Sequence, residues 1–557
     1  MGQSDIPPSS APPSSQVEPR KPAPSYRTVQ ALPAQLLEHC TVCIEEQLYS
    51  QAIALLQSTV TAGNGTARPA NVPPTQHLSL LATLVVHPSM TTRTTSKEKH
   101  IAADEALRYL HHLNSLTSAD ASGLAKALQF RDSGSSRSKR ARGRQSDISS
   151  DDENDDPGRI RSSYAKKESL FGNAEDFWAA VGWAFNCSVA YKDRWERWRL
   201  WLEFMLDVLE DDLDSRHRQA HESPNNKDKI FGKCLLAIYL APFIDQGRNP
   251  KRRIMRAILA DGTQPLLNQF PSVYLNETRP PKSKADSKIG TKRSLDLDQG
   301  EFGDYFDSDS DDNNDTTPGP APPSRTSTRH SSANVSRQDS PASSTAATTP
   351  TNNPTSPLAT HGGPTALRLR LRLLSLLSHF SSLAPALFLD PEDLFDLYTE
   401  FLRPLPLPVF SFLLLSNNNK TGLDPNSLAS LTQMLMRPLL SSHAPISNAN
   451  SLTPESFAAH FAPFAANVSN AAENSRVGVC VEVLLRLLWR EGSLGFAGEE
   501  VKGLVRRAVM EGIKAREEWV GSLGGDGRRK TGKEVTVEGV ESLRAGAERL
   551  RCLLAMV

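Results

Sequence analysis

Apolar residues recur every three or four positions through long stretches of this sequence, and this spacing restricts the chain to helical folds. In the first stretch they fall at Leu37, Cys40, Ile44, Leu48, Ala52 and Leu56. The spacing brings these side chains to one face of a helix, whereas a half-buried strand would alternate apolar and polar residues. The run LRLRLRLLSLL does alternate from Leu367 to Leu373, but its leucines also fit a helical face. We therefore predict an all-α protein.

The helical pattern is interrupted by segments whose composition is typical of disorder. Hydrophobic residues make up 38% of the 557 positions, and many of the 39 prolines are clustered. Such segments bury too little apolar surface to offset the entropy lost on ordering. We predict three helical blocks, packed as an irregular bundle or a solenoid, with a disordered tail and two disordered linkers. The tail covers 1–27, the blocks cover 28–130, 169–275 and 365–557, and the linkers cover 131–168 and 276–364.

Helix starts in the last block are marked by an N-cap residue that is followed by proline. Asp and Thr side chains accept hydrogen bonds from the free N–H groups of a first turn, and proline is tolerated there because it lacks an N–H. The pattern predicts starts at Asp390-Pro391, Asp424-Pro425 and Thr453-Pro454.

Tryptophan is concentrated in one part of the second block. Five of the seven tryptophans lie between Trp178 and Trp201. They could form an aromatic surface that binds a peptide or a base, or the core of a helical hairpin, and their helical spacing favours the core. The spacing Trp195-x-x-Trp198-x-x-Trp201 resembles the half-a-tetratricopeptide repeats of RNA-processing scaffolds. The helix pairs of 28–130 resemble a tetratricopeptide hairpin, without its period of about 34 residues.

One motif points to catalysis. The sequence RHRQAH resembles the motif of HEPN-type ribonucleases, and this resemblance implies Arg216, His217 and His221 as residues that act on an RNA phosphate across a helical dimer. The flanking segments EDDLDS and ESPNNKDK are polar, and the second contains Pro224. Such flanks favour a surface linker. We predict a linker here, with a HEPN-like ribonuclease as the alternative.

Other patterns resemble sites but are incomplete. Cys40 and Cys43, preceded by His39, have a metal-like spacing, but zinc needs four ligands and the sequence offers no second pair, so we predict buried structural cysteines. The stretch GRRKTGKE matches a phosphate-binding loop except at Glu534, where Ser or Thr would hold magnesium. Kinase, dinucleotide and nucleophile-elbow signatures are not found in the sequence. We expect no metal, no cofactor and no catalytic residue.

Charge is balanced over the chain but segregated locally. Lys plus Arg and Asp plus Glu both number 63, which argues against a surface built throughout to hold nucleic acid, so any such contact is expected to be indirect. The first linker contains a dense basic group that suits nuclear import, with phosphate binding on DNA or RNA and a solvated charge run as the alternatives. This import cluster consists of Arg137, Lys139, Arg140, Arg142 and Arg144. Six scattered cysteines indicate a reducing compartment, and no apolar run reaches the roughly 18 residues of a membrane span. We predict a nuclear protein without a membrane span.

Acidic and proline-rich contexts in the linkers predict phosphorylation. Serines beside acids suit acid-directed kinases, residues before proline suit proline-directed ones, and each phosphate adds about −1.5 to −2 charges. The predicted sites are Ser146, Ser149, Ser150, Ser308, Ser310, Thr317, Ser340, Thr349 and Ser356. The stretch EFGDYFDSD adds Phe302, Tyr305 and Phe306, which we predict to fold onto a partner, with residual hydrophobic side chains of a linker as the alternative.

Together these features predict a non-enzymatic scaffold or complex subunit in the nucleus. We expect it to bind protein partners and to be regulated by phosphorylation of its linkers. Chromatin maintenance, DNA repair and transcription would suit such a phosphoprotein. The alternative is an RNA-processing factor, either a helical-repeat scaffold or a HEPN-like ribonuclease.

Overall fold

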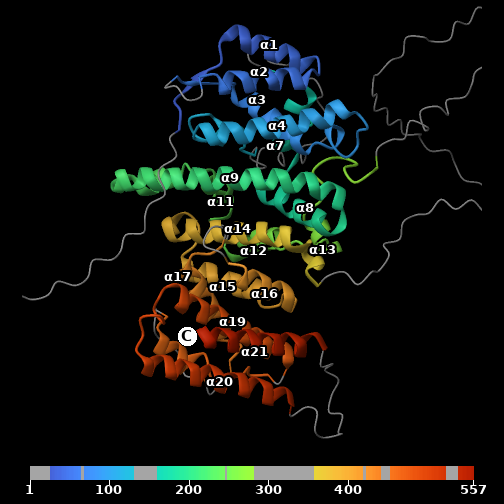
Figure 1. Cartoon of the computed structure of the whole chain (residues 1–557). Helices are drawn as coiled ribbons and strands as arrows, with labels where there is room; N and C mark the ends of the chain where they lie inside the picture. Colours follow the sequence, from blue (N-terminus) through green and yellow to red (C-terminus); the bar gives the residue numbers. More distant parts are fainter. Residues whose placement is uncertain are drawn as a thin grey trace, which may run out of the picture. The chain divides into compact units, whose positions relative to one another are not determined.

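The prediction of an all-α protein is confirmed. The computed structural model describes residues 26–63, 68–130, 160–244, 247–280, 357–417, 422–440, 444, 452–468, 470–521 and 537–556. These residues are predominantly helical and belong to one compact unit (Figure 1). A short parallel pairing of β1 (Val29–Ala31) with β2 (Ala70–Val72) accompanies the helices.

The first block consists of packed helical hairpins. Its helices are α1 (Ala34–Glu45), α2 (Tyr49–Thr61), α3 (Thr75–Val86), η1 (Pro88–Met90), α4 (Lys97–Leu116) and α5 (Leu124–Ala127). A turn at Gln47, with a φ of 59°, separates α1 from α2. The apolar stripe predicted from Leu37 to Leu56 is therefore interrupted: Cys40 and Leu56 are buried, but Leu48 lies at the N-cap of α2 and is 45% exposed.

The second block contains the tryptophan hairpin. Its helices are η2 (Ser163–Ala165), α7 (Leu170–Asn173), α8 (Phe177–Ala190), α9 (Lys192–Glu222), η3 (Pro224–Asn226), α10 (Lys227–Phe231), α11 (Leu235–Leu240), η4 (Ala241–Phe243), α12 (Arg248–Ile258) and α13 (Gln264–Gln269). Trp178, Trp198 and Trp201 have no exposed surface, and Trp183 and Trp195 are also buried. The prediction that these tryptophans form a core, and not a recognition surface, is confirmed by this burial.

The third block has the predicted helix starts. Its helices are η6 (Pro357–His361), α14 (Gly363–Leu383), η7 (Pro385–Leu387), α15 (Pro391–Leu402), α16 (Leu407–Leu415), α17 (Pro425–Met436), α18 (Pro454–His460), α19 (Ala471–Arg490), α20 (Glu499–Gly521) and α21 (Val537–Met556). The helices α15, α17 and α18 each begin with the predicted proline. Asp424 accepts a hydrogen bond from the Ser427 N–H at 3.1 Å, and Thr453 forms a capping box with Ser456.

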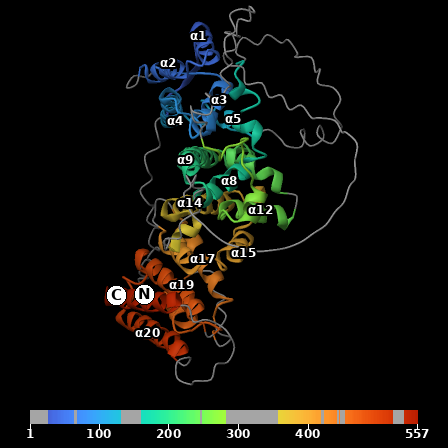
Figure 2. The ribbon, with the colours of Figure 1, turned by 90° about the vertical axis from the view of Figure 1, so that its right-hand side faces the viewer.

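The long helix α9 joins the three blocks. It packs against α3 and α4 of the first block and against α14 of the third, and Figures 1 and 2 both place α9 between α4 and α14. Its own hairpin partner is α8, which also contacts α12 and α14. One cluster of buried apolar side chains runs through all three blocks, so the block boundaries in the sequence are not boundaries of separate cores.

The folded region extends into both segments that composition assigned to linkers. Residues 131–159 and 281–356 lie outside the described residues, but the flanking residues pack. Ile160 is 1% exposed, η2 contacts α3, and Glu277 is 1% exposed. Composition misses Ile160 and Glu277 because each is a single buried side chain in a polar stretch.

Candidate functional site

The RHRQAH motif lies at the C-terminal end of α9 and not in a surface linker, so that prediction is wrong. The polar flank Asp211–Ser215 continues the amphipathic helix, because Asp212, Leu213, Arg216 and Ala220 are buried along one side. The helix ends at Glu222, just before Pro224. The motif therefore has the rigid helical setting that a catalytic site would need.

Arg216, however, forms ion pairs within the fold. Its side chain is 7% exposed, its Nη2 lies 3.3 Å from Oδ1 of Asp120, and its Nε lies 3.4 Å from Oδ1 of Asp212. Oδ2 of Asp212 in turn accepts a hydrogen bond from the Leu235 N–H at 2.8 Å. If Arg216 moved to an RNA phosphate, the buried carboxylate of Asp212 would lose its counter-charge, and an unpaired buried charge lowers the stability of the fold.

The two histidines lie elsewhere on the same helix. At about 100° per residue, His217 and His221 are displaced by about 100° and 140° from Arg216 around the helix axis. Their Nε2 atoms are 3.0 Å apart, and the ring of His379 on α14 meets the ring of His217 edge-on at 5.9 Å. Burial, together with the neighbouring His221 and His379, lowers the pKa of His217. The structure thus brings the histidines together but does not assemble them with Arg216 within one chain.

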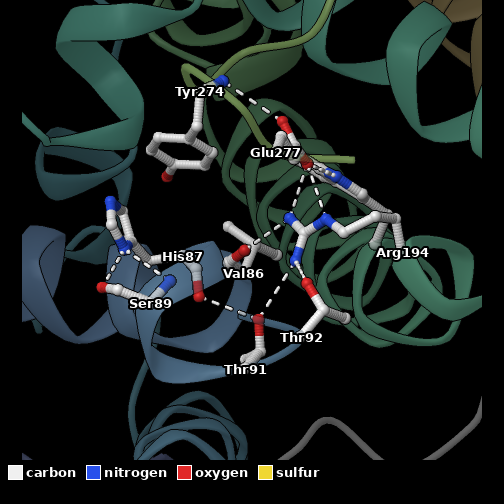
Figure 3. Close-up of polar contacts among 9 residues, drawn as sticks. Val86, His87, Ser89, Thr91, Thr92, Arg194, Tyr274 and Glu277 are labelled. Carbon is white, nitrogen blue, oxygen red and sulfur yellow. Dashed lines mark hydrogen bonds and ion pairs between the residues drawn. The ribbon is translucent and has the colours of Figure 1, made fainter. Parts of the chain in front are cut away.

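The most tightly connected polar site is one that the sequence did not indicate. It centres on Arg194 of α9 and Glu277, which follows α13 (Figure 3). Oε1 of Glu277 accepts hydrogen bonds from Nε of Arg194 at 2.8 Å and from Nε1 of Trp198 at 2.7 Å. Oε2 accepts the Tyr274 N–H at 3.1 Å. Both charged side chains are almost completely buried, at 2% and 0% exposure.

Arg194 also reaches the first block. Its Nη1 donates to Oγ1 of Thr91 at 3.0 Å and to Oγ1 of Thr92 at 3.1 Å, and its Nη2 donates to the Val86 carbonyl at 2.6 Å. The guanidinium therefore ties the end of α3, the loop after η1 and the segment after α13 to α9. We call this set of contacts the Arg194 junction.

His87 lies beside the Arg194 junction and is held neutral. Its Nδ1 accepts the Ser89 N–H at 3.3 Å, and its ring packs edge-on against Tyr164 at 4.7 Å and Tyr274 at 4.6 Å. Burial, with a smaller effect of the Arg194 charge, lowers the pKa of His87 to about 3. Glu168 is 3.9 Å from Nε2, but a neutral imidazole forms no ion pair with it at pH 7. The site is a closed set of polar contacts without an activated nucleophile, which fits a structural role.

The sequence carried a weak signal for this junction. Arg194 stands in a helix that is apolar around most of its circumference, so a buried guanidinium had to find acceptors. Nothing local identifies Glu277 as the partner, since it lies 83 residues further along in a polar stretch.

The remaining predicted sites divide into structural ones and ones outside the described residues. Cys40 and Cys43 are buried as predicted, burial raises the pKa of Cys40 to about 12, and no set of three or more metal-binding side chains occurs in the part of the chain that the structure describes. Four predicted features lie outside the described residues: the stretch 527–534, the import cluster, the nine predicted phosphorylation sites, and the group Phe302, Tyr305 and Phe306.

An open groove lies on the first block. It has a volume of about 460 Å³ and separates the start of α2 from the start of α4. Its lining includes Leu48 and Gln51 on one side and Glu98, Lys99 and Ala102 on the other. We call it the hairpin groove. The half-exposed Leu48 lies beside amide and charged groups, so the lining of the groove is partly apolar and partly polar.

Comparison with protein-family models, with curated proteins and with solved structures found no match to this chain. Among the described helices, none combines the length and the apolar character that crossing a membrane requires.

Proposed function

We propose that this chain is a non-enzymatic scaffold of a nuclear complex, which binds a protein partner in the hairpin groove and is regulated by phosphorylation of its linkers. The observation that carries the proposal is the contrast between the two kinds of site. The charged side chains of the Arg194 junction and of Arg216 are buried in contacts between helices, whereas the hairpin groove is open.

The groove has the size and chemistry for a peptide segment. Its volume of about 460 Å³ is within the range of about 300–1,000 Å³ that is typical of ligand sites. Leu48 offers an apolar contact, and Gln51, Glu98 and Lys99 offer donors and acceptors of both charges. A partner segment with one apolar anchor and flanking polar groups fits this lining, as in grooves that bind short helices or extended peptides.

The nuclear and regulatory parts of the proposal rest on the sequence. The import cluster supports a nuclear location, and the serine-rich and acidic linkers support regulation by kinases. Chromatin maintenance, DNA repair and transcription remain the processes that suit such a subunit. The ribonuclease alternative gains no support from the geometry, because Arg216 is held by Asp120 and Asp212.

The test is a Leu48→Arg variant of the full chain. Leu48 is 45% exposed, so the bulky charge should block the groove without unfolding the protein. The matched control is Met510→Arg on α20, where Met510 is 47% exposed. We expect the wild type and the control to recover the same proteins from nuclear extract, and Leu48→Arg to lose at least one of them at an unchanged thermal midpoint. Recovery of identical partners by all three chains would refute binding at the hairpin groove.

A further inference from the structure

A second groove lies beside Gln129 and Ile160, close to the two ends of the segment 131–159 that the structure does not describe. It has a volume of about 380 Å³ and opens between the start of α3, the short helix α5 and the segment from η2 to α7. We call it the linker groove. Its polar wall is made by Thr75, Gln76, Ser79, Lys126, Lys166 and Ser169.

The electrostatics of the linker groove favour an anion. Lys126 and Lys166 are both exposed, and no Asp or Glu occurs among the described residues that line the groove. The helix α3 begins here without a capping side chain, since Pro74 is its N-cap, and without an acid in its first turn. The partial positive charge of a helix N-terminus therefore adds to the two ammonium groups.

Ser169 adds a hydroxyl at a fixed position in the linker groove. It is only 6% exposed, it lines the groove, and none of the hydrogen bonds within the described residues uses its hydroxyl. Its carbonyl accepts the N–H groups of Gly172 and Asn173, which fixes its position. Because Ser169 lines the open groove, its hydroxyl can donate to a phosphate oxygen that enters there.

The chain itself contains a segment of matching charge in reach of the groove. Gln129 and Ile160, which flank residues 131–159, both line the groove. Ser150 precedes Ile160 by ten residues, and an extended chain spans at most about 3.3–3.6 Å per residue, or about 35 Å in this case. The stretch 146–156 carries six acids around Ser146, Ser149 and Ser150.

We propose that the linker groove binds this acidic stretch of the same chain when its serines are phosphorylated. The inference rests on the phosphorylation that the proposed function includes. Phosphate oxygens accept charge-assisted hydrogen bonds from Lys126 and Lys166, and the hydroxyls of Thr75, Ser79 and Ser169 complete their coordination. Because the segment is tethered at both ends to the groove, its effective concentration is of the order of millimolar, and it outcompetes a weak free ligand.

The first experiment measures binding of a fluorescent peptide that covers 144–157 with three phosphoserines. The wild-type chain, unphosphorylated, should bind it, and binding should weaken as salt rises because exposed charges are screened. The double variant Lys126→Glu, Lys166→Glu should lose about tenfold or more in affinity. The matched control is Lys229→Glu, Lys233→Glu, which reverses two exposed lysines of the second block and should bind like wild type. Equal affinity of both double variants would overturn the site.

The second experiment identifies the occupant. Full-length chain phosphorylated by an acid-directed kinase should bind the peptide about tenfold more weakly than unphosphorylated chain, because its own segment fills the groove. Changing Ser146, Ser149 and Ser150 to Ala before kinase treatment should restore binding. If the phosphorylated wild type still binds the peptide with full affinity, the groove serves a phosphopeptide of another protein and the proposal is wrong. Neither result depends on the partner recovery at the hairpin groove, so the two proposals fail separately.

Discussion

Removing the charge of Glu277 should destabilise the protein more than removing both charges of the Arg194 junction. A Glu277→Gln substitution keeps the side-chain shape and a carbonyl oxygen that can still accept from Nε1 of Trp198, but its NH2 group replaces Oε2, which accepts the Tyr274 N–H. It leaves the guanidinium of Arg194, only 2% exposed, without its counter-charge. Breaking one partner of a buried ion pair costs about 3–5 kcal/mol, so we expect a loss of this size in the free energy of unfolding.

The double variant Arg194→Met, Glu277→Gln gives the decisive comparison. A neutral pair of similar volume avoids the burial of an unpaired charge. The methionine leaves the Val86 carbonyl without its donor, and the weakened contact of the Tyr274 N–H with the substituted Glu277 side chain is common to the single and the double variant. A lost hydrogen bond of that kind costs about 1–3 kcal/mol, so the double variant should be more stable than the single Glu277→Gln variant by about 1–3 kcal/mol.

Urea unfolding followed by circular dichroism, on the wild type, both single variants and the double variant, yields the coupling energy between the two residues. A Glu277→Gln variant within about 0.5 kcal/mol of wild type would refute the reasoning, as would a double variant whose loss equals the sum of the two single losses.

Further predictions concern the core, the pH dependence and the location of the protein. Trp198→Ala should cost about 3–5 kcal/mol, because it empties a fully buried site, and an unchanged urea midpoint would contradict its place in the core. The free energy of unfolding should fall as pH drops from about 6.5, where unfolded histidine titrates, towards about 3, the pKa of folded His87. At pH 5 the neutral His87 lowers the free energy of unfolding by about 2 kcal/mol. A His87→Asn variant should therefore lose less stability than wild type between pH 7 and pH 5. Replacing the import cluster by alanines should move a fluorescently tagged chain to the cytoplasm, and an unchanged nuclear signal would discard the assignment of that cluster.

Local sequence signals were reliable where the structure depends on near neighbours. The prolines after Asp390, Asp424 and Thr453 predicted three helix starts, because an N-cap and a first turn involve residues three apart. The stripe through Leu37 to Leu56 was less accurate, since a turn at Gln47 re-orients the chain and leaves Leu48 exposed.

For the RHRQAH motif, too, the sequence indicated the local arrangement but not the distant contacts. The sequence presented Arg216, His217 and His221 as one motif, and its polar flanks suggested a linker. In the structure the histidines meet each other, whereas Arg216 is held by Asp120, which lies far from it along the chain. Polarity alone could not distinguish a linker from the buried side of a helix whose charges are paired.

The sequence by itself determined that the chain is helical, where three of its helices begin and that the tryptophans are buried, because periodicity and capping act over a few residues. Only the tertiary structure decided which charges pair, that the three blocks share one apolar core, and where the two grooves open. These features depend on contacts between residues tens of positions apart, such as Arg194 with Glu277 at a separation of 83, and no local pattern of residue types specifies such a partner.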